Sequence, residues 1–231
     1  MGTPHTGPAV TADGASCRLR PSPTAYAVRL EGLRARDGAA LDALLGKLPE
    51  PPWDAEVAVD DALVGLLGQR GFEVYAKGAV LARPVDGVPK GHVVGIDVVP
   101  YRNDWADAFT LAESAAMEGV AAFRELGSPS GYEWGEGQGA FWIARDAKGR
   151  LLGFAHADLP DGWIDWLGVV PESRRQGIGR ALVAAVAGQV RDGNGTHLVA
   201  FAEDGTDAGA FLRSLGFTER GRRALLIRRA G

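Results

Sequence analysis

The stretch from Arg174 to Leu182 constrains the fold more than any other part of the chain. It contains two glycines, Gly177 and Gly179, and it follows a short apolar run, Trp163 to Val170, before a helix opens. Glycine has no Cβ, so backbone amides can approach an anion closely here. The first turn of the helix adds unpaired N–H donors and the positive end of the helix dipole. We therefore expect a binding site for a pyrophosphate.

Three families of phosphate-binding proteins use a strand, a glycine loop and a helix in this way. A P-loop ends in Gly-Lys-Ser/Thr, which this stretch lacks, and a dinucleotide fold has a third glycine where this chain has Leu182. A dinucleotide loop also follows its strand almost directly, whereas residues 171–176 precede the first glycine here. An ordinary glycine-bearing helix start without any ligand is the non-functional alternative.

The longer lead-in resembles the R-x-x-G-x-G/A motif of the GCN5-related N-acetyltransferases (GNAT), which bind the pyrophosphate of acetyl-CoA. Residues 167–174 also resemble the fourth strand of that family and its exit. The resemblance implies that acetyl-CoA is the co-substrate, that two strand residues pair with pantetheine through their backbone, and that the loop amides hold the phosphates. The acetyl-CoA-binding residues it implies are Leu167, Val169, Arg174, Arg175, Gln176, Gly177, Ile178, Gly179 and Arg180.

Composition excludes several classes of protein. The 231 residues are 46% hydrophobic and carry a net charge of −4, which gives no basic surface for nucleic acid. The single cysteine, Cys17, cannot form an internal disulfide, and no signal peptide opens the chain. No apolar run approaches the roughly 20 residues that a membrane helix needs. We expect a cytoplasmic protein, monomeric or homodimeric, that binds neither nucleic acid nor membrane.

Charge is distributed unevenly along the chain. Residues 91–170 carry twelve acidic and five basic side chains, whereas residues 171–231 carry six acidic and ten basic ones. A basic segment suits the phosphates of CoA, and an acidic one suits a cationic acceptor such as an amine. The alternative is that most of these charges only solvate exposed faces.

The first part of the chain predicts a leader and a small domain. Residues 1–24, rich in Gly, Pro, Thr and Ser, are predicted to be a flexible leader. Residues 25–84 form the next predicted domain, and residues 85–91 are predicted to be a linker. Within 25–84 the patterns predict a strand at 25–33, a helix at 37–48, a strand at 55–59, a helix at 60–70 and a hairpin at 72–83.

The second part, residues 92–231, is predicted to be the catalytic GNAT domain. Its patterns predict a strand at 92–99, a helical stretch at 104–126 that breaks near Gly119, and three antiparallel strands at 141–145, 151–159 and 163–170. A helix at 177–191, a strand at 197–202, a helix at 207–215 and a last strand ending near Arg228 follow. This order resembles the GNAT acyl-CoA N-acyltransferase fold, an α/β (α+β) fold with a mixed, mostly antiparallel sheet flanked by helices.

The sequence also repeats itself at an offset of 145 residues. Gly71-Phe72 corresponds to Gly216-Phe217 and Arg83 to Arg228, without a gap. We interpret residues 25–84 as a degenerate half-GNAT-like domain, with an unrelated α+β segment as the alternative. Asp37 stands where the glycine loop of this half would be and would repel a pyrophosphate, so we expect no acetyl-CoA there.

Asp165 is the best candidate for the catalytic base. It interrupts an apolar strand and, by the two-residue period, shares a face with Leu167 and Val169. The resemblance places a base at this position in related enzymes, and a structural carboxylate is the alternative. His156 and Asp158 on the neighbouring strand share a face with Phe154 and offer a second route to the acceptor.

The sequence departs from the family at the general acid. Many members place a tyrosine four residues before the Gly-Phe pair, where this chain has Leu212. Tyr132 is the candidate replacement, in a glycine-rich loop at 127–139 that also carries Glu133, Trp134 and Glu136. The four histidines show no ligand spacing and there is one cysteine, so we predict no metal.

These patterns together predict an N-acetyltransferase. The expected reaction moves the acetyl group from acetyl-CoA to a primary amine by direct attack in a ternary complex. The expected acceptor is a small molecule or a peptide amine with a cationic character. The alternative, suggested by the missing tyrosine and the degenerate repeat, is a non-catalytic acyl-CoA sensor or interaction module.

Overall fold

The computed structural model describes residues 8–21, 28–59, 62–88, 91–121, 123, 139–159 and 161–229. The chain divides into two compact units, and each unit is built from separate stretches of the sequence. No helix among these described residues is long and apolar enough to cross a membrane. Unit 1 comprises Met1–Gly78, Ala121–Pro129 and Gly221–Gly231, and unit 2 comprises Ala79–Val120 and Ser130–Arg220.

Unit 1 is built on a mostly antiparallel set of strands. Their order is β1-β2-β3-β4-β11, and only β3 and β4 run parallel to each other. Two short helices pack on these strands, and Leu30, Leu41 and Leu67 are fully buried in the core between them. The elements are β1 (Ala9–Ala12), β2 (Ala15–Pro21), β3 (Val28–Ala35), α1 (Gly38–Leu45), β4 (Trp53–Ala58), α2 (Ala62–Gly68) and the second part of β11 (Thr218–Arg228).

Two predictions for this part of the chain are wrong. The expected flexible leader over residues 1–24 contains β1 and β2, which pair with each other and, through β2, with β3. Their residues alternate in burial, so Ala15 and Cys17 reach the core although the segment is rich in Gly, Pro and Thr. The expected hairpin at 72–83 is one continuous strand, β5 (Glu73–Pro84), whose residues Ala79 to Ala82 are buried.

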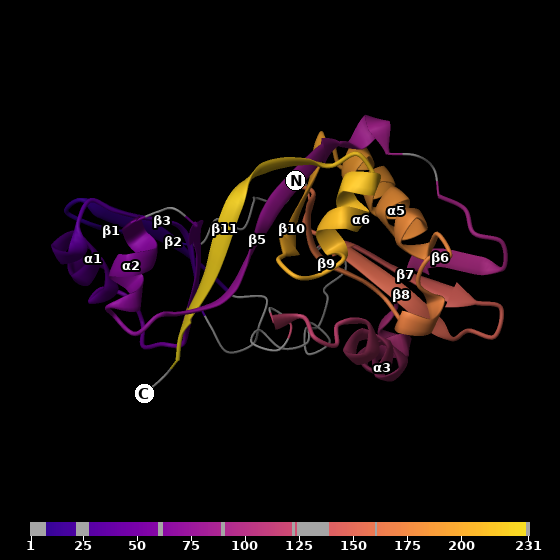
Figure 1. Ribbon diagram of the computed structural model, residues 1–231, viewed down its shortest axis with the longest axis horizontal. Helices are drawn as coiled ribbons and strands as arrows, with labels where there is room; N and C mark the ends of the chain where they lie inside the picture. Colours follow the sequence, from indigo (N-terminus) through magenta and orange to yellow (C-terminus); the bar gives the residue numbers. More distant parts are fainter. Residues whose placement is uncertain are drawn as a thin grey trace. The chain divides into compact units, whose positions relative to one another are not determined.

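Within unit 2, the strands β10-β9-β8-β7-β6 follow one another in the sheet (Figure 1). All neighbours among them are antiparallel except β9 and β10, which are parallel. This mixed, mostly antiparallel sheet flanked by helices confirms the predicted fold class. The elements are β6 (Ile96–Pro100), α3 (Ala106–Ala116), β7 (Ala140–Asp146), β8 (Leu151–Ala157), β9 (Trp163–Val169), α5 (Ile178–Asp192), β10 (His197–Glu203) and α6 (Ala208–Ser214).

Helices cover both faces of this sheet, as β8 shows. Successive side chains of a strand point to opposite faces. Phe154 packs edge-to-face on Phe109 of α3, with ring centroids 5.2 Å apart. A Cβ at the preceding residue, Gly153, would lie 3.2 Å from Leu182 of α5. The central strand is therefore buried on both faces, α3 covering one and α5 the other (Figure 1).

The helical stretch predicted at 104–126 breaks near Gly119 in the structure, as expected, and residues 121 and 123 are helical again. α3 ends at Ala116, and Gly119 follows with φ of 83°, a left-handed conformation that glycine adopts at low cost. The strand predicted from His92 begins only at Ile96. Its lead-in residue Gly91 lies against the backbone of Ala181, where a side chain would collide.

The internal repeat appears in the order of elements. β4, α2 and β5 begin at Trp53, Ala62 and Glu73, and β10, α6 and β11 begin 144 to 146 residues later. In both units the first strand of this series is parallel to the preceding strand, and one α-helix lies between the two. The strands are β3 and β4 in unit 1, and β9 and β10 in unit 2. The repeat therefore extends over strand, helix, strand, helix and strand.

The last strand of each series leaves the unit in which it begins. β5 starts in unit 1, and its residues from Ala79 onward belong to unit 2. β11 starts in unit 2, where Thr218 Oγ1 donates to the carbonyl of Ala82, and its residues from Gly221 onward belong to unit 1. There β11 pairs with β4, from Arg223 opposite Ala58 to Arg228 opposite Trp53.

Candidate functional site

β9 and β10 pair only at the beginning of β9. The register joins Trp163 to Val199 and Ile164 to Ala200, and no further pair joins these two strands within the described residues. From Asp165 onward, the edge of β9 that faces β10 therefore has backbone groups available to a ligand's hydrogen bonds, apart from the Val169 carbonyl, which accepts from Arg174 Nε. Leu167 and Val169, the residues expected to pair with pantetheine, lie in this part, and both are half-buried.

The start of α5 leaves backbone N–H groups without a side-chain cap. Gly177 is the N-cap, with φ of 85°, and no side chain caps the helix. The first backbone bond that closes a turn runs from Ala181 N–H to the Gly177 carbonyl, at 3.1 Å. The amides of Ile178, Gly179 and Arg180 precede that bond, so they lack an intrahelical acceptor. They are suited to bind a pyrophosphate, as the sequence predicts.

The remaining loop residues present backbone rather than side chains to such an anion. Arg175 has φ of 63°, a left-handed conformation that turns the loop into the helix. The Ile178 side chain is 1% exposed and packs into the core, so only its amide is available to a ligand. Arg175, Gln176 and Arg180 have exposed side chains, which leaves their charge and polarity at the rim of the loop.

The side chain of Arg174 bonds to the backbone of two other elements. Its Nε donates to the carbonyl of Val169 at 3.1 Å, and its Nη2 donates to the carbonyl of Ala116 at 3.2 Å. The side chain thereby ties the end of α3 to the end of β9. The guanidinium keeps its charge and the side chain is exposed, so the expectation that Arg174 adds charge for the phosphates stays a prediction.

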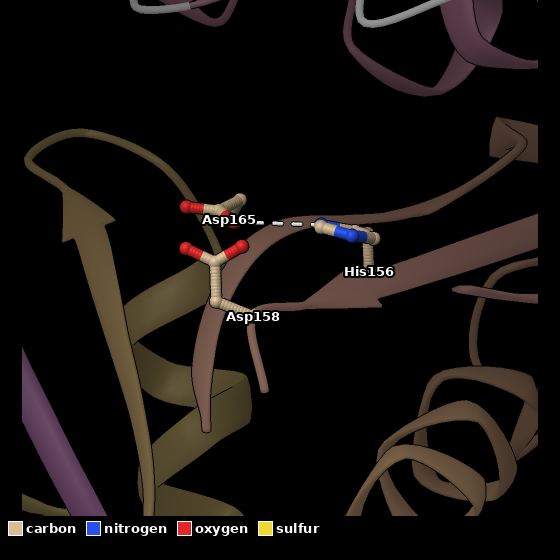
Figure 2. A group of neighbouring side chains, drawn as sticks. All are labelled: His156, Asp158 and Asp165. Carbon is tan, nitrogen blue, oxygen red and sulfur yellow. Dashed lines mark ion pairs between the residues drawn. The ribbon is translucent and has the colours of Figure 1, made fainter. Parts of the chain in front are cut away.

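Asp165 lies where β9 separates from β10, next to two further polar side chains (Figure 2). Asp165 Oδ2 is 3.4 Å from His156 Nδ1, and the two side chains are 15% and 3% exposed. One ligand atom from each of His156, Asp158 and Asp165 lies within 4.8 Å of the others. The predicted base therefore has an imidazole and a second carboxylate beside it.

An irregular register brings these side chains together. His156 is opposite Trp166, but the next residue, Ala157, is opposite Ile164, so Asp165 is the extra residue of a β-bulge. Bulges redirect side chains and are common near active sites. The sequence offered His156 and Asp158 as a second route to the acceptor but could not show that the bulge joins them to Asp165. Histidine spacing gave no indication of this group, and the prediction that the protein binds no metal stays a prediction.

Aromatic side chains surround this cluster on the face that α3 covers. His156 packs edge-to-face on Phe141, with ring centroids 5.8 Å apart, and Tyr101 stacks on Phe141 at 4.3 Å. Burial, and then the nearby carboxylates of Asp104 and Glu113, raise the pKa of Tyr101, so its phenol stays protonated at neutral pH. This apolar wall excludes water from one side of His156.

Two positions were considered for the general acid. One lies in the core, and the other lies outside the described residues. Leu212 is 2% exposed and belongs to the core, so α6 supplies no acid at that position. Its neighbour Phe211 instead packs near Gly179, where a Cβ would lie 3.0 Å from the ring. Tyr132, Glu133, Trp134 and Glu136 lie outside the described residues.

Part of the chain matches a known family model. Residues 137–219 match the family model described as acetyltransferase (GNAT) domain. A curated mycothiol acetyltransferase from Catenulispora acidiphila is 28% identical over 221 residues, which cover 86% of this chain and 70% of that protein.

Solved structures share the fold of the whole chain. A GCN5-related N-acetyltransferase from Kribbella flavida has a TM-score of 0.66 at 18% identity and covers 98% of this chain and 91% of its own. The tandem GNAT protein from the clavulanic acid biosynthesis pathway has a TM-score of 0.56 at 16% identity, covering 94% of this chain and 79% of its own. Together with the glycine loop at α5, these findings show that residues 137–219 match a GNAT acetyltransferase domain and that the chain has the GNAT fold.

Proposed function

We propose that this chain is an acetyl-CoA-dependent N-acetyltransferase that acetylates a primary amine by direct attack within a ternary complex. GNAT acetyltransferases use acetyl-CoA as co-substrate, and the residues of unit 2 fit it. The uncapped start of α5 would hold the pyrophosphate, and the open edge of β9 would pair with the pantetheine arm. The observation that carries the proposal is the position of Asp165 at the point where that edge begins.

Positioning supplies most of the rate in such a reaction. Holding an amine against a thioester can lower the barrier by roughly 7–11 kcal/mol, and a backbone N–H on the open part of β9 can polarise the thioester carbonyl. The amine must lose a proton before or during its attack. Asp165 would take that proton, and His156, 3.4 Å away, would hold the carboxylate in place.

The proposed acceptor is a small, cationic amine. The acidic excess of residues 91–170, twelve acidic against five basic side chains, favours a cation, and Asp158 places a second carboxylate beside Asp165. The curated relative carries the name mycothiol acetyltransferase, which supports a small-molecule acceptor. Glu133 and Glu136, with Trp134, would contribute further attraction and an aromatic face for the ammonium.

A thiol-release assay with acetyl-CoA and a panel of amines tests the activity. We expect Asp165→Asn to lower kcat by about 10²–10⁴-fold while the Kd for acetyl-CoA changes little. Asp161→Asn is the matched control, because Asp161 is an exposed acid in the turn just before β9 and should leave kcat unchanged. A melting curve for each variant shows that the fold is intact.

Two outcomes would contradict the proposal in different ways. A small loss of rate in Asp165→Asn would remove this residue as the base and leave the activity standing. Binding of acetyl-CoA without thiol release for any amine would favour the second candidate, a non-catalytic acyl-CoA sensor or interaction module. The buried Leu212 at the position of the usual tyrosine is the observation that favours this alternative.

Ionic strength separates a cationic acceptor from a neutral one. If carboxylates attract the amine, the KM for the amine should rise with salt, and Glu133→Gln with Glu136→Gln should raise it further. The KM for acetyl-CoA should not respond to these two substitutions. Faster turnover with neutral or acidic acceptors would rule out this choice of substrate.

A further inference from the structure

The group formed by His156, Asp158 and Asp165 has a geometry that suits a divalent metal ion. It offers one imidazole nitrogen and two carboxylates, with the three donor atoms all within 4.8 Å of one another. Figure 2 shows the two carboxylates side by side, with the imidazole directed at Asp165. We propose that these three side chains form a binding site for a divalent transition-metal ion of the Zn²⁺ class.

The separation between His156 and Asp165 supports a shared ion. Their nearest atoms, Nδ1 and Oδ2, are 3.4 Å apart. An ordinary N–H···O hydrogen bond is about 2.7–3.2 Å long, so the pair is wider than a good direct bond. Two ligands that each lie about 2.0–2.1 Å from a tetrahedral zinc ion are about 3.4 Å from one another. The observed spacing therefore matches two ligands of one zinc ion.

The charges in the cluster also favour a cation. Two carboxylates with oxygens within 4.8 Å of each other repel when both are ionised, and a divalent ion between them would remove that repulsion. Asp158 and Asp165 are each half-buried, so water screens the repulsion only in part. A site with a nitrogen ligand suits Zn²⁺, whereas Mg²⁺ and Ca²⁺ prefer oxygen ligands throughout.

The scaffold holds the imidazole in a fixed orientation. His156 lies on β8 between β7 and β9, and the ring of Phe141 packs against it. A Cβ at Gly139 would collide with His156 Nε2, so the backbone of Gly139 covers that side of the ring. Nδ1 is the nitrogen that faces the Asp165 carboxylate. Three protein ligands leave a fourth, open position, the arrangement found in exchangeable zinc sites rather than closed structural ones.

The site overlaps the proposed base, which gives the inference a consequence for activity. An ion held by Asp165 occupies the lone pairs that would accept the proton of the amine. Zn²⁺ should therefore inhibit acetyl transfer, and a chelator should restore it. Metal binding itself does not depend on the proposed function, because it can be measured in the absence of acetyl-CoA and amine.

Calorimetry with ZnCl₂ on the full chain, after treatment with a chelator, tests the site. We expect one Zn²⁺ per chain, and an affinity at least about 100-fold weaker in Asp158→Asn, since even outer-shell changes at metal sites cost 10–100-fold. His156→Gln should have the same effect. His197→Ala is the matched control, because His197 is exposed at the start of β10 and should leave the affinity unchanged.

Cobalt gives a second readout at the same site. Co²⁺ in a tetrahedral site with one nitrogen and two carboxylate ligands should show visible absorption that Asp158→Asn abolishes. Asp158 lies just beyond the end of β8, so this variant should fold even if His156→Gln does not. Absence of saturable Zn²⁺ binding, or wild-type affinity in a folded Asp158→Asn protein, would overturn the proposal. Failure of the amine assay with normal zinc binding would overturn only the proposed function.

Discussion

The starts of α5 and α1 occupy matching places in the two units but differ at the position that decides whether an anion can bind. α5 begins at Gly177, in a left-handed conformation and without a side-chain cap. α1 begins at Asp37, with extended backbone, and the Asp37 carboxylate accepts from the amide of Ala40 at 2.8 Å. α1 thus carries its own anion at its start, whereas α5 leaves its backbone donors open.

The length of the lead-in differs as well. Eight residues, 170–177, separate β9 from α5, whereas only Arg36 and Asp37 separate β3 from α1. A two-residue connection has no room for a loop of amides around a phosphate. Both helices have a dipole, so the dipole alone does not make an anion site. The residue at the cap and the length of the connection determine whether an anion can bind.

The largest expected effect comes from giving α5 the cap of α1. Gly177→Asp would place a carboxylate at the start of α5 and should weaken acetyl-CoA binding by about 100-fold or more, since like charges brought together cost several kcal/mol. Calorimetry with CoA measures the change. Gly177→Asn is the control, because asparagine tolerates the left-handed conformation without adding charge and should lose much less affinity. Equal losses in both variants would mean that backbone strain, and not the cap, closes the site.

Arg174 tests whether the open loop of α5 needs its structural tie. Arg174→Lys keeps the charge but cannot hold the carbonyls of Val169 and Ala116 together, so the free energy of unfolding should fall by about 1–2 kcal/mol. The Kd for acetyl-CoA should rise less than in Gly177→Asp. Urea unfolding and calorimetry measure the two quantities. Unchanged stability with a strong, salt-dependent loss of affinity for acetyl-CoA would show that Arg174 acts by direct contact with phosphate.

The smallest expected effect lies in α1, at Asp37. The amide of Ala40 and then Arg36 hold the pKa of Asp37 below its ordinary value of 3.8. A lowered pKa in the folded state means that Asp37 stabilises the fold above that ordinary value and that this contribution is lost as the pH falls through the folded value. Asp37→Asn should therefore flatten the acid limb of the stability curve slightly.

The same variant sharpens the comparison of the two helices. Neither Asp37→Asn nor Asp37→Gly should create a second site for acetyl-CoA, because the short connection from β3 to α1 is unchanged. Thermal melts at pH 3 to 7 and calorimetric stoichiometry check both parts. Two CoA molecules bound per chain in Asp37→Gly would show that the carboxylate alone kept the first helix closed.

The sequence predicted unit 2 well because its signals are local. The glycines of the α5 loop, the alternating residues of β9 and the turn before Trp163 lie close together along the chain, and the structure confirms the elements they predict. Asp165 lies on the strand predicted from the same short stretch, whereas the point at which β9 separates from β10 is known only from the register.

What the sequence missed depends on contacts between distant residues. Arg174 donates to Ala116, 58 positions away, and no local pattern reports such a bond. His156 and Asp165 come together because of a β-bulge, and this bulge is defined only by the way β8 pairs with β9. The two strands within residues 9–21 were hidden by a composition typical of flexible segments, because their partner β3 supplies the stability that their own residues lack.

The path of β11 has a consequence for how the protein is made. β4 is synthesised within the first 58 residues, but its antiparallel partner, Arg223–Arg228, emerges from the ribosome some 165 residues later. At about 5–20 residues per second, that delay is on the order of ten seconds or more, during which the edge of β4 has no native partner. Unit 1 cannot complete its fold first, although its strands are translated first. A fragment that stops before residue 221 should expose this edge and aggregate, and one that begins at residue 92 would lack the part of β5 that belongs to unit 2.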